Sequence, residues 1–265
     1  MHVVSILNLK GGVGKTTTAV NLAAAGFYSG RRTLLVDLDP QNSTTDHLSN
    51  ADFETTAGAM LKGECTFEAA CHRLFSSEDE RACLDLLPSG KLELTEADVM
   101  LQSRAAKNRL KSLLRKAGRA MAVPYDLVVI DTGPGLDFLW FNALYTADMV
   151  VCPVELQMAA IVGLRRFLEV LDFANEDEGL DAPVYYLPTN NDGRVKESGE
   201  LLEVLHEQFG VFPEGKVLPP IRYSAALSKA LGARQSIFAF DPTDRSAADY
   251  AALLHTLMQE VVTHG

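Results

Sequence analysis

Eight consecutive residues near the amino terminus have the types and spacing of a phosphate-binding loop. They read Lys-Gly-Gly-Val-Gly-Lys-Thr-Thr and run from residue 10 to residue 17. Glycine permits backbone angles that direct successive N–H groups at phosphate oxygens, and a following helix adds its positive end. A lysine and a hydroxyl then suit the β- and γ-phosphates and a bridging Mg²⁺. The octapeptide therefore predicts a nucleoside triphosphate site.

Individual roles can be assigned within this loop. Lys15 is expected to meet the β- and γ-phosphates, and the Thr16 hydroxyl to bind Mg²⁺. The other nucleotide-binding positions offer main-chain N–H groups, and they are Gly11, Gly12, Val13, Gly14 and Thr17. Lys10 is less easily explained, because it stands at the end of the preceding apolar run, where an ordinary phosphate loop needs no cation.

The loop lies between a predicted strand and a predicted helix. An apolar run over residues 3–7 precedes it, and residues 17–25 have the pattern of a helix. This order of features distinguishes a nucleotide site from a chance glycine-rich turn, because a strand, a loop, a lysine, a hydroxyl and a helix follow one another.

Aspartates end two other apolar runs. Asp37 and Asp39 follow one run, and Asp131 follows another. Ligands of open α/β sheets bind at the carboxyl ends of buried parallel strands. On a continuous strand, side chains two residues apart share a face, but a turn changes this relationship. A break at Pro40 therefore determines how Asp37 and Asp39 serve one site. We assign Asp37 and Asp131, with Thr16, to the surroundings of Mg²⁺.

Together these motifs resemble the ParA/MinD family of dimerising P-loop ATPases. Lys10 matches the early lysine of that family's K-G-G-x-G-K-[TS] loop, and residues 37–41 match its D-x-D-P-Q signature. The resemblance implies that Lys10 crosses a dimer interface to the partner's nucleotide, and that Asp39 helps to place the attacking water. With Lys15, these are the expected catalytic residues. Family members often have D-T-P-P where residues 131–134 read Asp-Thr-Gly-Pro, which predicts a more flexible segment here.

The rest of the chain alternates strand-like and helix-like segments. Strand-like runs cover residues 3–7, 33–37, 84–87, 127–131, 149–153 and 184–187, with 215–218 as a further candidate. Such alternation predicts an α/β fold of the P-loop NTPase type, with a mostly parallel sheet flanked by helices on both faces. Its length suits one P-loop ATPase domain over residues 1–265. The polar residues 76–80 are expected to form a surface loop.

Composition predicts a cytoplasmic protein. No apolar stretch approaches about 18 residues, and the amino terminus lacks the features of a signal peptide.

The four cysteines include no C-x-x-C pair, so we expect each cysteine to be a small packing residue. This disfavours a metal-cluster carrier, since the nitrogenase-iron-protein relatives of the superfamily hold a cluster with paired cysteines. Because the loop begins at residue 10, we expect no operator-reading module before it.

The resemblance also implies where the adenine lies. It combines the strand end at Thr189 and Asn190 with the main chain near Pro219 and Pro220. Asn190 carries two donors and an acceptor that suit a base edge. Capping of a turn is an equally good interpretation of this residue.

Two basic regions are candidates for contact with DNA, although the net charge is −11. The first, from Ser103 to Arg119, has an inward leucine stripe and seven cations without an acid: Arg104, Lys107, Arg109, Lys111, Arg115, Lys116 and Arg119. A solvated outer face is its alternative interpretation. The second region is implied by the resemblance, since short partition ATPases bind DNA nonspecifically through this part of the fold. The region contains Arg194, Lys196, Arg222, Lys229 and Arg234, and the expected DNA-binding residues are Arg194, Arg222, Lys229 and Arg234.

The carboxyl-terminal residues separate two branches of the family. Residues 246–265 have apolar residues at helical spacing, but only Asp249 and Glu260 are charged. MinD-like members end in a basic membrane-binding helix, so a packed helix is the better prediction. The resemblance then implies an ATP-dependent homodimer that binds DNA nonspecifically, is nucleoid-associated, and uses partner-stimulated hydrolysis to position a cargo. A plasmid, a chromosome origin or a carboxysome-like assembly would serve as cargo. A MinD-like membrane-associated regulator of cell division is one alternative, and a nucleotide-dependent scaffold with negligible turnover is another.

Overall fold

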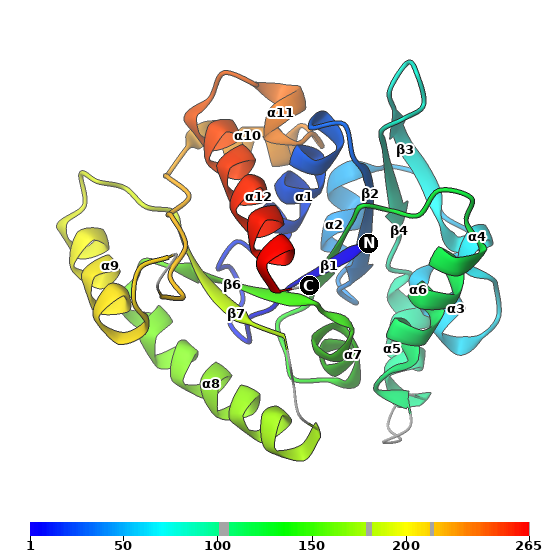
Figure 1. The fold of residues 1–265 in the computed structure, drawn as a ribbon, viewed down its shortest axis with the longest axis horizontal. Coiled ribbons are helices and arrows are strands. Elements are labelled where there is room, and N and C mark those ends of the chain that lie inside the picture. The colour runs from blue at the N-terminus through cyan, green and yellow to red at the C-terminus, as the bar shows by residue number, and fades with distance from the viewer. Residues whose placement is uncertain (101–105, 179–181, 213–214, 265) are drawn as a thin grey trace.

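A seven-stranded sheet forms the centre of the molecule (Figure 1). The computed structural model describes residues 1–100, 106–178, 182–212 and 215–264. In chain order the strands are β1 (His2–Ile6), β2 (Arg32–Leu38), β3 (His72–Ser76), β4 (Cys83–Leu87), β5 (Leu127–Thr132), β6 (Met149–Glu155) and β7 (Val184–Thr189). They lie in the order β3-β4-β2-β5-β1-β6-β7, and every neighbouring pair is parallel except β3 with β4.

Helices cover both faces of this sheet, as predicted. They are α1 (Lys15–Tyr28), α2 (Ser43–Leu48), α3 (Ala57–Lys62), α4 (Phe67–Ala70), α5 (Lys91–Met100), α6 (Arg109–Ala120), α7 (Phe138–Thr146), α8 (Met158–Glu178), α9 (Lys196–Phe209), α10 (Ala225–Gly232), α11 (Ile237–Phe240) and α12 (Arg245–His264). Buried residues of α3 to α9 form one core, and those of α1 and α10 to α12 form the other. Figure 1 shows α1, α10, α11 and α12 on one side of the sheet and α7 and α8 on the other. The predicted α/β fold is confirmed.

The strand order places the loop after β1 at the middle of the sheet. Alternate side chains of β1 enter the two cores, with Val3 in one and Val4 and Ile6 in the other. Strand β1 lies between β5 and β6, while the chain itself runs from β1 through α1 to β2. The carboxyl end of β1 is therefore at a topological switch point, where open α/β sheets bind ligands.

Several elements differ from their predicted form. Strand β3 was not predicted, because its alternating and mostly exposed His-Arg-Leu-Phe-Ser sequence lacks a buried apolar run. It is the antiparallel edge of the sheet, and residues 77–82 form the turn of its hairpin with β4. Residues 215–218 are not a strand, since Val217 forms only isolated bridges with Tyr186 and Val211. Helix α6 begins at Arg109, and Arg104 lies outside the described residues.

The carboxyl-terminal helix packs against the molecule. Ala247, Tyr250, Leu254 and Leu257 of α12 are buried in the core that contains α1. No helix in the described ranges is long and apolar enough to cross a membrane. All four cysteines are free thiols. The described part of the chain holds no group of three or more His, Cys, Asp or Glu side chains arranged to bind a metal ion.

Candidate nucleotide site

The loop between β1 and α1 has the backbone of a phosphate site. Gly12 and Gly14 have φ angles of 77° and 92°, which only glycine adopts without strain. Gly14 is the N-cap of α1, and no side chain caps this end. The first N–H groups of α1 are therefore available to an anion, with the helix dipole behind them. The Thr189 hydroxyl donates to the Val13 carbonyl oxygen at 2.9 Å and ties the loop to β7.

A cavity of about 320 Å³ lies in front of this loop. The residues that line it are Gly11, Gly12, Gly14, Lys15, Thr16, Thr17, Asp39, Gln41, Ser43, Thr132 and Pro134. Lys15 is only 6% exposed, and its Nζ donates to the main-chain oxygen of Lys10 at 2.9 Å. Burial lowers the pKa of Lys15, and the carboxylates of Asp131 and Asp39 oppose that shift. The cavity thus combines a cation, free N–H groups and hydroxyls, which suits the phosphates of a nucleotide.

Asp131 joins the loop to the switch-point strands. Its Oδ2 accepts hydrogen bonds from the Thr16 hydroxyl at 2.8 Å and the Thr44 hydroxyl at 2.7 Å. Burial raises the pKa of Asp131 to about 6, and the two hydroxyl hydrogen bonds oppose this shift. Its Oδ1 is buried and has no hydrogen-bond partner in the described part of the chain. Mg²⁺ with its bound water fits here, because a hydroxyl and a carboxylate with a free oxygen are the hard donors that it requires.

Asp37 lies beside Asp131 in the sheet, where β2 pairs with β5. It is fully buried, and it does not line the phosphate cavity. Its Oδ1 accepts from the Asp39 N–H at 3.0 Å, and its Oδ2 from the Thr45 N–H and hydroxyl at 2.8 and 2.7 Å. Burial and then the nearby Asp131 carboxylate raise the pKa of Asp37 to about 8. Asp37 therefore holds the turn after β2, and Thr16 and Asp131 are the better candidates to hold Mg²⁺.

Asp39 does line the cavity, because the chain turns immediately after β2. Its Oδ1 accepts from the Gln41 N–H at 2.8 Å and its Oδ2 from the Ser43 hydroxyl at 2.7 Å. Gly133 lies directly against it, since a Cβ on this glycine would stand 2.9 Å from Asp39 Oδ1. The sequence suggested flexibility at Gly133. The structure gives a second physical reason for this glycine, which is the close approach of Asp39.

Lys10 lies outside the phosphate cavity of its own chain. It lines a separate surface cavity of about 230 Å³ with Leu9, Gly135, Leu136, Gly163 and Arg166. Its stem packs on α8, since a Cβ on Gly163 would lie 3.7 Å from Lys10 Cβ and 3.8 Å from its Cδ. Leu136 in the same cavity is 45% exposed. The two lysines of the loop thus face different cavities.

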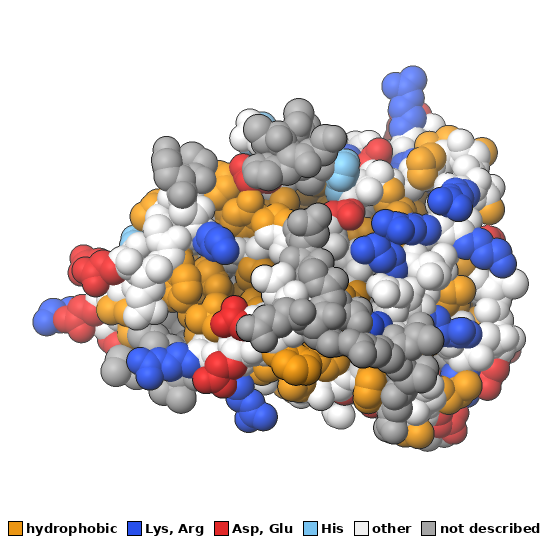
Figure 2. Space-filling model, turned by 60° about the horizontal axis from the view of Figure 1, so that its bottom comes forward, with side chains coloured by type: hydrophobic (Ala, Val, Ile, Leu, Met, Phe, Trp, Pro, Cys, Tyr) orange, Lys and Arg blue, Asp and Glu red, His pale blue; other side chains and the backbone are white. Residues whose placement is uncertain are grey.

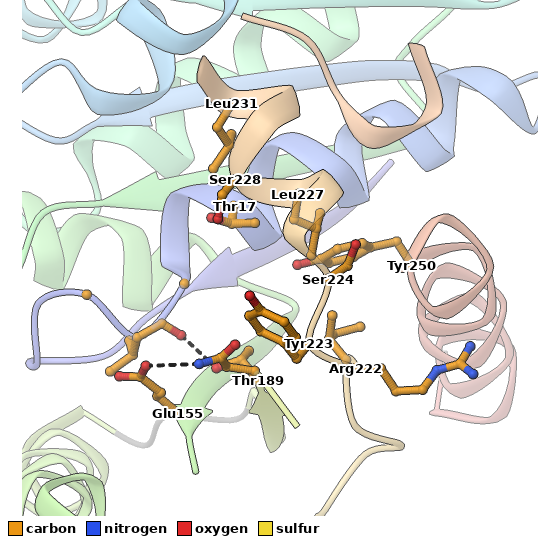
Figure 3. Close-up of a pocket in the computed structure, with 15 residues that line it drawn as sticks. Thr17, Glu155, Thr189, Arg222, Tyr223, Ser224, Leu227, Ser228, Leu231 and Tyr250 are labelled. Carbon is orange, nitrogen blue, oxygen red and sulfur yellow. Dashed lines mark hydrogen bonds between the residues drawn. The ribbon is translucent and has the colours of Figure 1, made fainter. Parts of the chain in front are cut away.

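A second cavity, of about 240 Å³, adjoins the phosphate cavity at Gly12, Gly14 and Thr17 (Figure 3). Its other lining residues are Val13, Glu155, Thr189, Asn190, Ile221, Arg222, Tyr223, Ser224, Leu227, Ser228, Leu231 and Tyr250. Asn190 has a φ of 57°, and its Nδ2 donates to Glu155 Oε1 at 3.4 Å. Aromatic and aliphatic walls with a few polar groups suit a nucleobase.

Pro219, predicted near the base, is exposed and is not one of the residues that line this cavity. The wall is formed by residues 221–224 instead. Asn191 donates its N–H to the Ile221 carbonyl oxygen at 3.1 Å, and Tyr223 donates to the Asn191 carbonyl oxygen at 2.9 Å. These bonds hold the segment beside the end of β7. Tyr223 and Glu155 belong to no sequence motif, so sequence reasoning did not identify them.

Two of the predicted DNA-binding residues are neutralised by acids. Arg194 donates two hydrogen bonds to Asp192, at 2.9 and 2.7 Å, and it holds the pKa of Asp192 at about 2. Arg222 pairs with Asp249 at 2.7 Å, and in Figure 3 its guanidinium points away from the cavity toward α12. Lys229 is exposed on α10. Arg234 lines another cavity, beside α2 and α5. Within the single chain, two of the four predicted cations are thus paired with carboxylates.

Comparison with known proteins agrees with this geometry. The AAA domain family profile matches residues 1–181. The chain is similar to the sporulation initiation inhibitor protein Soj of Bacillus subtilis (31% identity, 99% of each chain) and to the chromosome-partitioning ATPase Soj of Thermus thermophilus (33%, 97% of this chain and 96% of the relative). A crystal structure of cobyrinic acid a,c-diamide synthase from Mycobacterium smegmatis with a bound ATP analog and magnesium has a TM-score of 0.80 at 27% identity, over 100% of this chain and 97% of that one. The chain belongs to the Soj/ParA family of P-loop proteins.

Proposed function

We propose that this chain is an ATPase that binds ATP with Mg²⁺, forms a homodimer in that state, and positions or segregates a cargo. The observation that carries the proposal is the place of Lys10. Its side chain lines a surface cavity rather than the phosphate cavity of its own chain, so it is available to the nucleotide of a second copy. The name of the Thermus thermophilus relative, a chromosome-partitioning ATPase, supports the same function.

Hydrolysis is expected to use the residues of the phosphate cavity. The N–H groups at the start of α1 and the Lys15 ammonium bind the β- and γ-phosphates. Thr16 and Asp131 would hold Mg²⁺, which would supply positive charge beside those phosphates. Asp39 orients a water whose oxygen bonds to the γ-phosphorus while the bond to the β–γ bridging oxygen breaks. The products are ADP and phosphate, and Lys10 of the second copy stabilises the charge that develops on the bridging oxygen.

The dimer is expected to bind duplex DNA of any sequence. A cargo-bound partner protein would stimulate hydrolysis, which is weak in its absence, and so release the dimer from the DNA. We place the protein in the cytoplasm, associated with the nucleoid. The cargo is a plasmid, a chromosome origin or a carboxysome-like assembly. The proposal of a MinD-like membrane regulator has less support, because the apolar face of α12 is buried against α1.

Light scattering with ATP, ADP or a slowly hydrolysed ATP analogue tests the proposal. We expect a doubling of mass with ATP and Mg²⁺ but not with ADP, and DNA binding that appears with the dimer. A protein that stays monomeric with ATP would contradict the dimer. An ATP-dependent dimer that ignores DNA at low salt but binds vesicles of anionic phospholipid would favour the membrane regulator.

A further inference from the structure

Helix α6 presents three exposed cations on its outer side. Leu110, Leu114 and Ala117 are buried in the core, which fixes the orientation of the helix. Arg115, Lys116 and Arg119 are exposed, and we name them the α6 patch. Arg119 lies four positions after Arg115 and three after Lys116, and residues at these spacings are neighbours on a helix surface, so the three charges form one group. Figure 2 shows Lys and Arg side chains gathered on the right of the molecule, on the side of α5 and α6.

The α6 patch has no acidic compensation of its own. Residues 106–125 contain no Asp or Glu. Within the described residues, none of the three side chains forms a hydrogen bond or an ion pair. One turn earlier, the Lys111 Nζ donates to the uncharged main-chain oxygen of Tyr145 at 2.9 Å, which holds a further positive charge on this helix. The patch therefore remains positive in a chain of net charge −11.

The arginines of the other basic region are in a different electrostatic state. Arg194 and Arg222 each share two hydrogen bonds or more with one carboxylate, those of Asp192 and Asp249. Each pair has no net charge, and a phosphate would have to compete with the carboxylate. Attraction to a polyanion depends on the cations that a surface leaves uncompensated. The α6 patch is better suited to this role than either pair.

The α6 patch lies toward the amino-terminal ends of β1 and β5, opposite the end that carries the phosphate loop. The chain passes from α6 into β5, which is parallel to β1. The last turn of α6 is beside the start of β1, since a Cβ on Gly118 would lie 3.7 Å from the Met1 sulfur. The phosphate loop follows the opposite end of β1. A ligand on the α6 patch would therefore not compete with ATP.

We propose that the α6 patch binds the phosphates of duplex DNA. The inference rests on the proposed function, because it names the surface by which the ATP dimer contacts DNA. Arginine and lysine on a rigid helix suit a row of phosphates. Leu110 and Leu114 of α6 are buried and Leu113 is partly buried, so the helix has no exposed leucine to insert into a bilayer. Three cations bind weakly alone. A dimer carries two patches that can engage separate segments of long DNA, so dimerisation would strengthen binding although neither patch touches ATP.

Neutralising the patch tests the inference. The variant carries Arg115→Gln, Lys116→Gln and Arg119→Gln. The control carries the same loss of charge outside both basic regions through Arg81→Gln, Lys91→Gln and Lys216→Gln, all at exposed positions. DNA affinity is measured by fluorescence anisotropy with ATP and Mg²⁺ over a range of salt. Because each phosphate contact contributes about 0.9 to the slope of log affinity against log salt, the patch variant should lose about 3 from that slope for each patch engaged, and about tenfold or more in affinity. The control should stay within about twofold of the wild type.

Three outcomes would overturn the inference, and they can be told apart. A wild type that binds no DNA would remove both the inference and the DNA-binding part of the proposed function. A patch variant that binds DNA as the control does, while Arg194→Gln abolishes binding, would remove the inference alone. Patch-dependent binding to phosphatidylglycerol vesicles without binding to DNA would assign the surface to membrane. Both triple variants should keep the wild-type unfolding midpoint and ATP affinity, and Arg115→Lys with Arg119→Lys should retain DNA binding.

Discussion

The Lys15 ammonium donates a hydrogen bond to the main-chain oxygen of Lys10 at 2.9 Å, so the two lysines of the loop are joined while their side chains face different cavities. Lys15 is buried behind the phosphate position, and its hydrogen bond supports the turn of the loop. The Lys10 side chain does not line this cavity, and we propose that it contacts the nucleotide of a second copy. This arrangement predicts different defects for the two alanine variants.

Lys15→Ala should abolish ATP binding. The loop would lose the ammonium that meets the β- and γ-phosphates, and no other cation lines the described phosphate cavity. Isothermal titration calorimetry with ATP and Mg²⁺ measures the effect. An affinity within twofold of the wild type would show that the phosphate site lies elsewhere.

Lys10→Ala should bind ATP with nearly unchanged affinity but fail to dimerise. Its side chain contacts α8 near Gly163 and does not line its own phosphate cavity. Calorimetry gives the affinity and light scattering gives the mass. Arg166→Ala, in the same surface cavity, controls for a general disturbance of that surface. A Lys10→Ala protein that dimerises normally, or that no longer binds ATP as a monomer, would contradict the assignment.

Asp39→Ala should form the ATP dimer but hydrolyse ATP slowly. The lost carboxylate acts on the chemical step, while Lys15, Thr16 and Asp131 remain in place. The loss in turnover should be on the order of 100-fold or more, as expected for a positioned acid or base. Phosphate release in single-turnover conditions measures this step. Wild-type turnover in the presence of the cognate partner would exclude Asp39 from the mechanism.

Gly133→Ala should reduce turnover more than ATP affinity. The new Cβ would stand 2.9 Å from Asp39 Oδ1, so the carboxylate must shift from its bonds with Gln41 and Ser43. ATP affinity and turnover are compared with those of Gly193→Ala, a glycine with nothing within 4 Å of its Cβ position. Equal turnover in both variants would mean that the position of Asp39 does not depend on this glycine.

Asp131→Asn should change how stability depends on pH in the absence of Mg²⁺. The folded pKa of Asp131 is raised from 3.8 to about 6, so its ionisation favours the unfolded chain. The stability that it contributes is complete below pH 3.8 and is lost as pH rises through about 6, a change on the order of 3 kcal/mol. Urea unfolding at several pH values should show the variant gaining stability relative to the wild type between pH 4 and 7. Mg²⁺ should stabilise only the wild type, and a constant difference across this range would contradict the prediction.

The sequence alone determined the parts of the site that depend on consecutive residues. Loop geometry follows from Gly12 and Gly14, and the cation and hydroxyl follow directly from Lys15 and Thr16. The buried strands were predictable because each is a continuous apolar run, and β3 was not, because an exposed edge strand needs no such run. These are local properties of the chain.

Tertiary structure decided everything that depends on strand order and on distant contacts. Asp131 meets Thr16 and Thr44 across 115 and 87 residues because β5 lies between β2 and β1. Residues 221–224 replace Pro219 at the base cavity because main-chain hydrogen bonds to Asn191 hold them beside β7. Arg222 is neutralised because α12 brings Asp249 to it, while the α6 patch remains uncompensated. The charge of a surface depends on which distant side chains folding brings together. The local sequence around one residue does not show this.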